Sequence, residues 1–204
     1  MKNLTWQNPE QLFVAQELIN KVKSKCCGIK DDKKNVWDCF VDPKDFDSDK
    51  TSFKYVIDYT FYRPRDLLLF FLKIGEQEIP LPISKSNIKK LSGPYANEMI
   101  REVKGELSSE FTNNDINGAL TVLSKHNNKR PFSYETFLDE LNDIGVKKAE
   151  ELAERLFDCS LIGNFNDPDV RFKCRENEGL LYELDKSQSL ILHYVMRSYF
   201  YKNH

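Results

Sequence analysis

The segment from Tyr62 to Gly75 constrains the fold of this chain more than any other, because it carries helix signals at both ends. Pro64 suits the first helical position, Asp66 suits the electropositive first turn, and Gly75 suits the end of a helix. The six residues Leu67–Leu72 are all apolar and cover nearly the whole circumference. The sequence therefore predicts a helix that is buried inside a helical domain.

Two arginines, Arg63 and Arg65, stand at the start of this predicted helix. A guanidinium held there presents a planar fork of donors that fits a phosphate or a carboxylate. Two interpretations of Arg65 stay open: it binds the phosphate of a nucleotide, or it pairs with a structural carboxylate. Residue types alone favour the structural pairing.

The composition is that of a folded, water-soluble protein. The 204 residues are 40% hydrophobic and 30% charged, and this length suits two small helical units. No apolar run approaches the roughly 20 residues that cross a bilayer, and the polar N-terminus lacks the apolar stretch of a signal peptide. We therefore expect a cytoplasmic protein without membrane contact.

The residue types that often form catalytic or metal sites are present in this chain, but their spacing does not fit such roles. The cysteines are odd in number without Cys-x-x-Cys spacing, and the histidines lack a second ligand type at metal-binding spacing. The sequence has neither a Gly-x-x-x-x-Gly-Lys-Ser/Thr loop nor a Gly-x-Ser-x-Gly elbow. We expect reduced structural thiols, no metal site, no cofactor in this chain and no autonomous catalysis. The residues concerned are Cys26, Cys27, Cys39, Cys159, Cys174, His126, His193 and His204.

Apolar residues at helical spacing organise the first two thirds of the chain. Helices are expected over 9–25, over 84–91 up to an interruption at Gly93-Pro94, then over 95–107, and from Asp115 onward. Residues 28–49 are expected to be an irregular loop, and residues 52–62 a short helix or an extended entry. The buried stripe of the first helix is expected to comprise Leu12, Ala15, Leu18, Ile19 and Val22.

The C-terminal third has the order of a winged helix-turn-helix. After a polar linker over 126–131, Ser133 is the expected N-cap of a helix, with Phe132 and Phe137 as its hydrophobic staple. A tight connection over 142–145 leads to a second helix over 147–158. Extended runs over 161–165 and 170–175 flank the turn 166–169, which indicates a hairpin. A further strand is expected over 180–184, and a closing apolar element over 190–201.

Basic residues of this region are candidates for contact with nucleic acid or a protein partner. Lys147 and Lys148 begin the helix that would enter a major groove, but that helix is net negative. Arg171, Lys173 and Arg175 alternate with apolar residues, so we expect them to project from one strand face. The simpler interpretation, a solvated strand face, is favoured.

The run Arg63-Pro64-Arg65-Asp66-Leu67, with a capped helix upstream and a terminal winged-helix pattern, resembles the C-terminal part of bacterial AAA-like and STAND-like P-loop ATPases. Some members of these families are linked to phage defence. The resemblance covers nearly the whole chain, including the hairpin segments 161–165 and 172–176, and implies that Arg65, or less favourably Arg63, contacts the terminal phosphates of ATP. The P-loop core that precedes this region in such ATPases is not in this sequence.

These observations lead to a mainly α fold, with a helical lid-like bundle over 1–112 followed by a winged helix-turn-helix and a small β-hairpin over 113–204. The leading hypothesis is a noncatalytic lid and winged-helix module that senses nucleotide. Its partners would be a P-loop ATPase core in cis or in trans and a protein bound by the winged helix, with ATP present only if such a core is joined. The alternative is a freestanding winged-helix regulator that binds nucleic acid, a partner that is not favoured.

Overall fold

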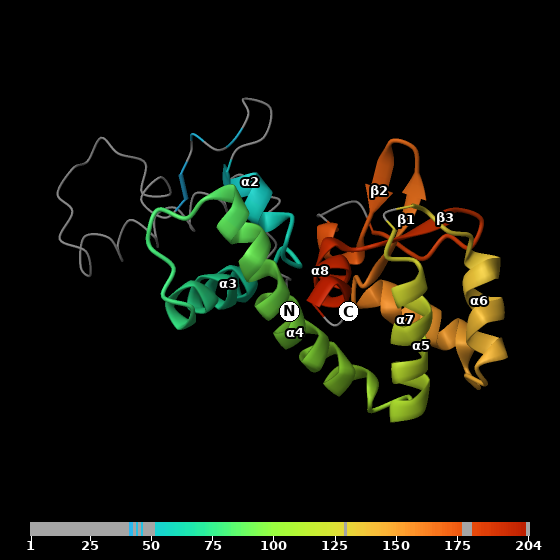
Figure 1. Cartoon of the computed structure of the whole chain (residues 1–204). Helices are drawn as coiled ribbons and strands as arrows, with labels where there is room; N and C mark the ends of the chain where they lie inside the picture. Colours follow the sequence, from blue (N-terminus) through green and yellow to red (C-terminus); the bar gives the residue numbers. More distant parts are fainter. Residues whose placement is uncertain are drawn as a thin grey trace. The chain divides into compact units, whose positions relative to one another are not determined.

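The computed structural model describes residues 41, 42, 44, 46, 52–128, 130–176 and 181–202. Within these residues the protein is mainly helical, with one small three-stranded antiparallel sheet, as the sequence predicted (Figure 1). By packing, the chain divides into two units, Met1–Ser92 and Gly93–His204. The domain boundary expected at 112/113 stays a prediction. The helix predicted over 9–25 and most of the loop predicted over 28–49 lie outside the described residues, as do Cys26, Cys27, Cys39 and His204.

The first unit contains α2 (Ser52–Ile57), α3 (Pro64–Glu76) and the start of α4 (Lys85–Leu107). Of the two alternatives for residues 52–62, a short helix or an extended entry, the structure has the helix, and the predicted start of α3 at Pro64 is confirmed. Val41 forms an isolated parallel bridge with Ile83, and both side chains are buried. The buried apolar residues of the unit's helices include Val56, Ile57, Leu67, Phe70, Ile74, Ile88 and Leu91.

The prediction that α3 is buried nearly all round was wrong for one face. Leu67, Phe70 and Ile74 are buried, whereas Leu68 is 70% exposed and Leu72 is 57% exposed. An unbroken run of apolar residues fixes the helix but leaves open which face packs inward. The inward face is the one that also carries the buried carboxylate of Asp66.

The interruption predicted at Gly93-Pro94 was also wrong, because α4 runs without a break and contains Pro94. Proline inside a helix removes one backbone hydrogen bond and costs about 3 kcal/mol. The buried residues Leu91, Tyr95 and Met99 continue at helical spacing across this point. Burial of that continuous stripe outweighs the local cost of the proline.

The second unit contains three consecutive helices: α5 (Asn113–Lys125), α6 (Tyr134–Asp143) and α7 (Ala149–Asp158). The predicted cap of α6 is confirmed, because the Ser133 hydroxyl accepts a hydrogen bond from the Thr136 backbone N–H at 3.0 Å. The predicted staple is present as well, with the rings of Phe132 and Phe137 5.8 Å apart. The tight connection between α6 and α7 uses Gly145 at a positive φ of 81°.

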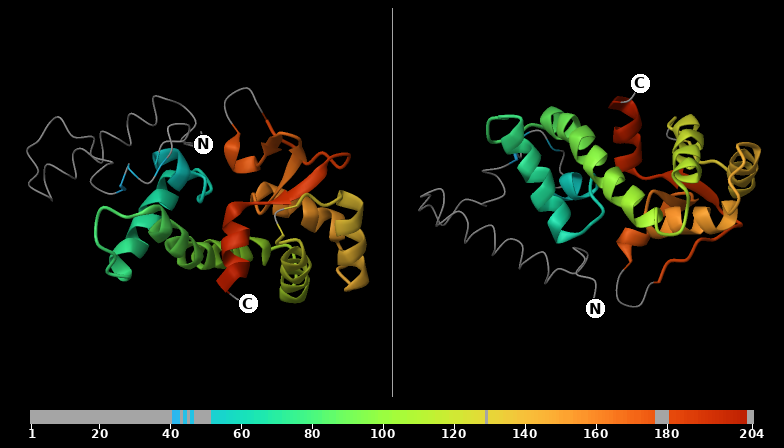
Figure 2. Two further views of the ribbon diagram at one scale, coloured as in Figure 1. Left: turned by 45° about the horizontal axis from the view of Figure 1, so that its top comes forward. Right: turned by 90° about the horizontal axis from the view of Figure 1, so that it is seen from below.

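The sheet of this unit has the order β2-β1-β3 and lies beside α5, α6 and α7 in each view (Figure 2). The predicted hairpin is β1 (Ile162–Asn166) paired antiparallel with β2 (Asp169–Arg171). On its other side β1 pairs antiparallel with β3 (Ser189–Leu192), and Leu190 of β3 exchanges backbone hydrogen bonds with Phe132. The strands thus tie the start of α6 to the C-terminal part of the chain.

Two predicted boundaries in this part of the chain were wrong. The second extended run ends at Arg171, and Lys173–Arg175 form a 3-10 turn, η4. The strand expected over 180–184 is absent from residues 181–184, since β3 lies later and is followed by α8 (Tyr194–Lys202). Leu190–Leu192 are buried whereas Leu181 is exposed, so the later segment supplies the apolar strand that the sheet requires.

Candidate functional site

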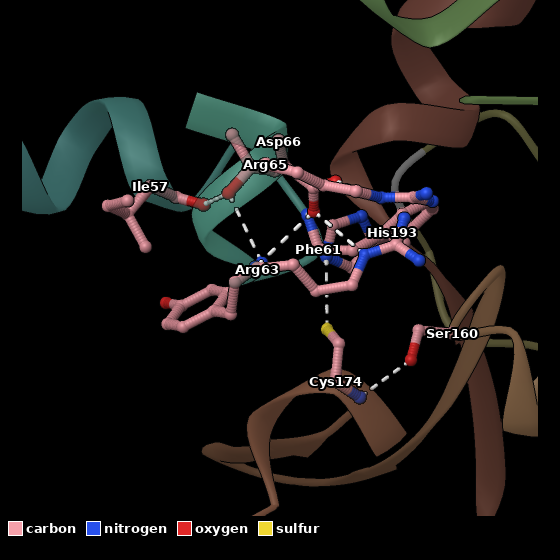
Figure 3. Close-up of polar contacts among 10 residues, drawn as sticks. Ile57, Phe61, Arg63, Arg65, Asp66, Ser160, Cys174 and His193 are labelled. Atoms are coloured by element: carbon pink, nitrogen blue, oxygen red, sulfur yellow. Dashed lines mark hydrogen bonds and ion pairs between the residues drawn. The ribbon is translucent and has the colours of Figure 1, made fainter. Parts of the chain in front are cut away.

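The turn before α3 is built around the buried carboxylate of Asp66 (Figure 3). One oxygen, Oδ2, accepts hydrogen bonds from the backbone N–H groups of Phe61 at 3.1 Å and Arg63 at 3.3 Å. Between them, Tyr62 has a positive φ of 60°, a conformation that a tyrosine rarely adopts. The carboxylate therefore fixes both the turn and the direction in which α3 begins.

The two arginines of this turn have different surroundings. Arg63 donates a hydrogen bond from Nε to the same Asp66 oxygen at 3.2 Å, and its guanidinium lies over the ring of Phe61. Arg65 lies in the first turn of α3, its side chain is 54% exposed, and its Nε is 3.9 Å from the other Asp66 oxygen. The expected pairing of Arg65 with a structural carboxylate is therefore present at 3.9 Å, and Arg63 makes the shorter contact with the same carboxylate at 3.2 Å.

A second polar cluster connects α2 with this turn. The Tyr62 hydroxyl donates a short hydrogen bond to Oδ1 of Asp58, and Lys54 donates to the same oxygen at 3.1 Å. Asp58 is buried, so two donors compensate its burial. The sequence analysis placed Asp66 in the first turn of the helix but predicted neither its bonds to the preceding backbone nor the role of Asp58. The available signal was an acidic residue four positions after Lys54 and another two positions after Pro64.

The basic residues of the hairpin do not form the single strand face that was expected. Arg171 is exposed at the end of β2, whereas Lys173 and Arg175 lie in η4. Lys173 forms an ion pair with Glu176 at 2.6 Å, and the Arg175 guanidinium lies over the ring of Phe172 at 5.1 Å. Because β2 ends at Arg171, the alternation that would align the three side chains is lost.

The exposed face of α7 is acidic and covered with ion pairs. Lys148 pairs with Glu151 at 2.7 Å, and Lys186 lies 3.0 Å from both Glu150 and Glu154. The hydrogen bond to Glu154, then that to Glu150, raises the pKa of Lys186. Lys147 is exposed at the connection before α7. A helix with this charge distribution is poorly suited to approach phosphates.

A contact between the partly buried thiol of Cys174 and the buried imidazole of His193 was not predicted, since the two residues are far apart in the sequence. The Cys174 sulfur lies 4.0 Å from Nε2 of His193, and the Cys174 backbone N–H donates to the Ser160 hydroxyl (Figure 3). Nδ1 of His193 accepts a hydrogen bond from the Val195 backbone N–H, so the ring proton of the neutral imidazole lies on Nε2. In this tautomer Nε2 carries a proton and offers no lone pair to the thiol of Cys174.

The second described thiol, Cys159, is expected to react slowly. Burial, reinforced by the nearby carboxylate of Glu106, raises its pKa from 9.0 to about 11. In the folded protein near pH 8 we therefore expect alkylation by iodoacetamide to be roughly 100-fold slower than for an ordinary thiol. The rate is measured by mass spectrometry of the Cys159 peptide, with the urea-unfolded protein as control. Equal rates in the folded and unfolded protein would contradict the raised pKa.

Comparison with known proteins gives one family. Residues 13–104 match the model of the FunZ-associated C-terminal helical domain, a description that places such domains at the C-terminus of larger proteins. The match covers less than half of the chain and includes α2, α3 and the turn with Arg63 and Arg65. No curated protein and no solved structure matches the chain.

Two features are absent from the residues that the structure describes. Within them, no group of three or more His, Cys, Asp or Glu side chains is arranged to hold a metal ion. None of the described helices combines the length and the apolar character that a membrane crossing requires.

Proposed function

We propose that this chain is a noncatalytic module of a P-loop ATPase, in which Arg65 contacts the terminal phosphates of ATP and the second unit binds a protein. The observation that carries the proposal is the position of Arg65. It stands in the first turn of a helix whose start is fixed by a buried carboxylate, yet half of its side chain is exposed.

This geometry suits a sensor of nucleotide state. The fixed start of α3 sets the position from which the exposed guanidinium of Arg65 reaches a phosphate. Loss of the terminal phosphate on hydrolysis removes the contact, and a helix that starts at a rigid turn moves as one body in response. Arg63 is the less favourable candidate because its Nε is bound to Asp66.

The family match supports a role as the C-terminal helical part of a larger assembly. The resemblance of Arg63-Pro64-Arg65-Asp66-Leu67 to an ATPase lid motif supports ATP as the nucleotide. For the second unit, the paired acidic face of α7 favours a protein partner over nucleic acid. The nucleic-acid alternative loses support because Arg171, Lys173 and Arg175 do not form one basic stripe.

The test is ATP turnover by the assembly that co-purifies with the tagged full chain from its native cell. We expect a protein with a P-loop in that assembly, identified by mass spectrometry. Arg65→Ala is expected to lower kcat by on the order of 100-fold, as when one donor to a developing charge is removed. Arg65→Lys should recover only part of the rate, because an ammonium lacks the planar fork.

The matched control is Arg101→Ala, an arginine of α4 whose side chain is 76% exposed and pairs locally with Glu98. This variant should leave turnover unchanged. Circular dichroism should show equal helix content in all variants. If an intact assembly with Arg65→Ala turns over ATP at the original rate, or if no P-loop protein co-purifies, the proposal fails.

A further inference from the structure

One face of α3 exposes apolar side chains beside Arg65. Leu68 and Leu72 are one helical turn apart and are 70% and 57% exposed. Arg65 precedes Leu68 by three residues and therefore lies on the same face. We call the exposed surface formed by Leu68 and Leu72 the α3 leucine strip.

The strip is not explained by the packing of the described residues. The opposite face of α3 packs into the core through Leu67, Phe70 and Ile74. Single exposed leucines are common on protein surfaces, but two large ones in adjacent turns of one helix form a contiguous apolar surface. Such a surface is stabilised when an amphipathic element covers it.

We propose that residues 9–25 of this same chain cover the α3 leucine strip as an amphipathic helix. The sequence of this segment has apolar residues at helical spacing, which need a partner surface because an isolated helix of this length is marginal in water. Leu12, Leu18 and Val22 are of the size that packs between leucines on a facing helix.

The extent of the family match supports this choice of occupant. The match begins at residue 13, inside the segment, and ends at residue 104, beyond α3. The matched region thus contains residues 13–25 of the segment and the whole strip, and its description is that of a helical domain. A surface inside one domain is covered most simply by another part of that domain. A segment of the same chain does not lose the translational and rotational freedom that a separate partner loses on binding.

The test is hydrogen–deuterium exchange of the full chain, read by mass spectrometry on peptides from residues 9–25. In the unmodified protein we expect their amides to exchange at least about tenfold more slowly than in an unfolded peptide. Leu68→Ser with Leu72→Ser should remove this protection, while peptides from α5, α6 and α7 keep theirs. Both positions are exposed, so the substitutions leave the core intact.

Two further variants make the result specific. Leu181→Ser replaces another exposed leucine, outside α3, and should leave the exchange of residues 9–25 unchanged. The reciprocal variant Leu18→Ser with Val22→Ser should speed exchange in the same segment without altering the second unit. Together these variants separate loss of docking from a general loss of stability.

Three outcomes would overturn the proposal. Unprotected amides over 9–25 in the unmodified protein would show that the segment does not dock. Protection that survives Leu68→Ser with Leu72→Ser would show that it docks elsewhere. Protection that rises with protein concentration would assign the strip to a second copy of the chain. None of these outcomes bears on Arg65 and ATP turnover, so this proposal and the proposed function fail separately.

Discussion

Asp66→Ala is expected to lower the free energy of unfolding by about 3 kcal/mol, because the backbone N–H groups of Phe61 and Arg63 lose their acceptor. Each buried donor left without a partner costs about 1–3 kcal/mol. The lost ion pair with Arg63 adds little, since the arginine side chain is 36% exposed and solvent screens the interaction. Urea unfolding followed by circular dichroism measures the change.

Two comparison variants locate this effect in the carboxylate. Asp66→Asn keeps one acceptor oxygen, so its loss of stability should be smaller than that of the alanine variant. Asp139→Ala removes an exposed carboxylate from α6 and should change stability by less than about 0.5 kcal/mol. An alanine variant at position 66 as stable as the unmodified protein would show that the carboxylate does not hold the turn.

Gly163→Ala is expected to destabilise the protein by about 3 kcal/mol, at the upper end of the usual cost of overpacking. A Cβ at this position of β1 would lie 2.5 Å from the backbone oxygen of Arg171 and 2.5 Å from the ring of Phe172. Arg171 belongs to the paired strand and Phe172 is buried, so neither can move aside without disturbing the hairpin. Thermal unfolding by calorimetry measures the change.

The matched control for this substitution is Gly105→Ala in α4. A Cβ there meets no atom within 4 Å, so alanine should stabilise the helix by about 0.5–1 kcal/mol. The two substitutions add the same methyl group and are expected to have opposite signs. A similar melting temperature for the two variants would contradict the close approach of β1 and β2.

The features that could be predicted from the sequence are those fixed by neighbours in the chain. The start of α3 at Pro64, the Ser133 cap and the Phe132–Phe137 staple each depend on residues within five positions. The hairpin also follows from a local turn between two extended runs. In these cases the local conformational preference agrees with the final packing, so the sequence pattern is sufficient to predict the structure.

The features that could not be predicted depend on packing between distant residues. Helix α4 continues through Pro94 because its buried stripe outweighs a local cost that the sequence shows plainly. The pairing of Cys174 with His193 requires β3 to lie beside β1, and no local signal specifies that pairing. For Arg65 and Arg63, the sequence identified the turn but not that Arg63 would make the shorter contact with Asp66.

The position of β3 has a consequence for synthesis of the protein on the ribosome. Strand β3 pairs with both β1 and Phe132, although it follows α5, α6, α7 and the hairpin in the chain. While the nascent chain lacks residues 189–192, one edge of β1 has no strand beside it from the second unit. An unpaired strand edge with apolar residues that are buried in the folded protein is a template for association with other chains. The second unit therefore completes its sheet only after β3 has been translated.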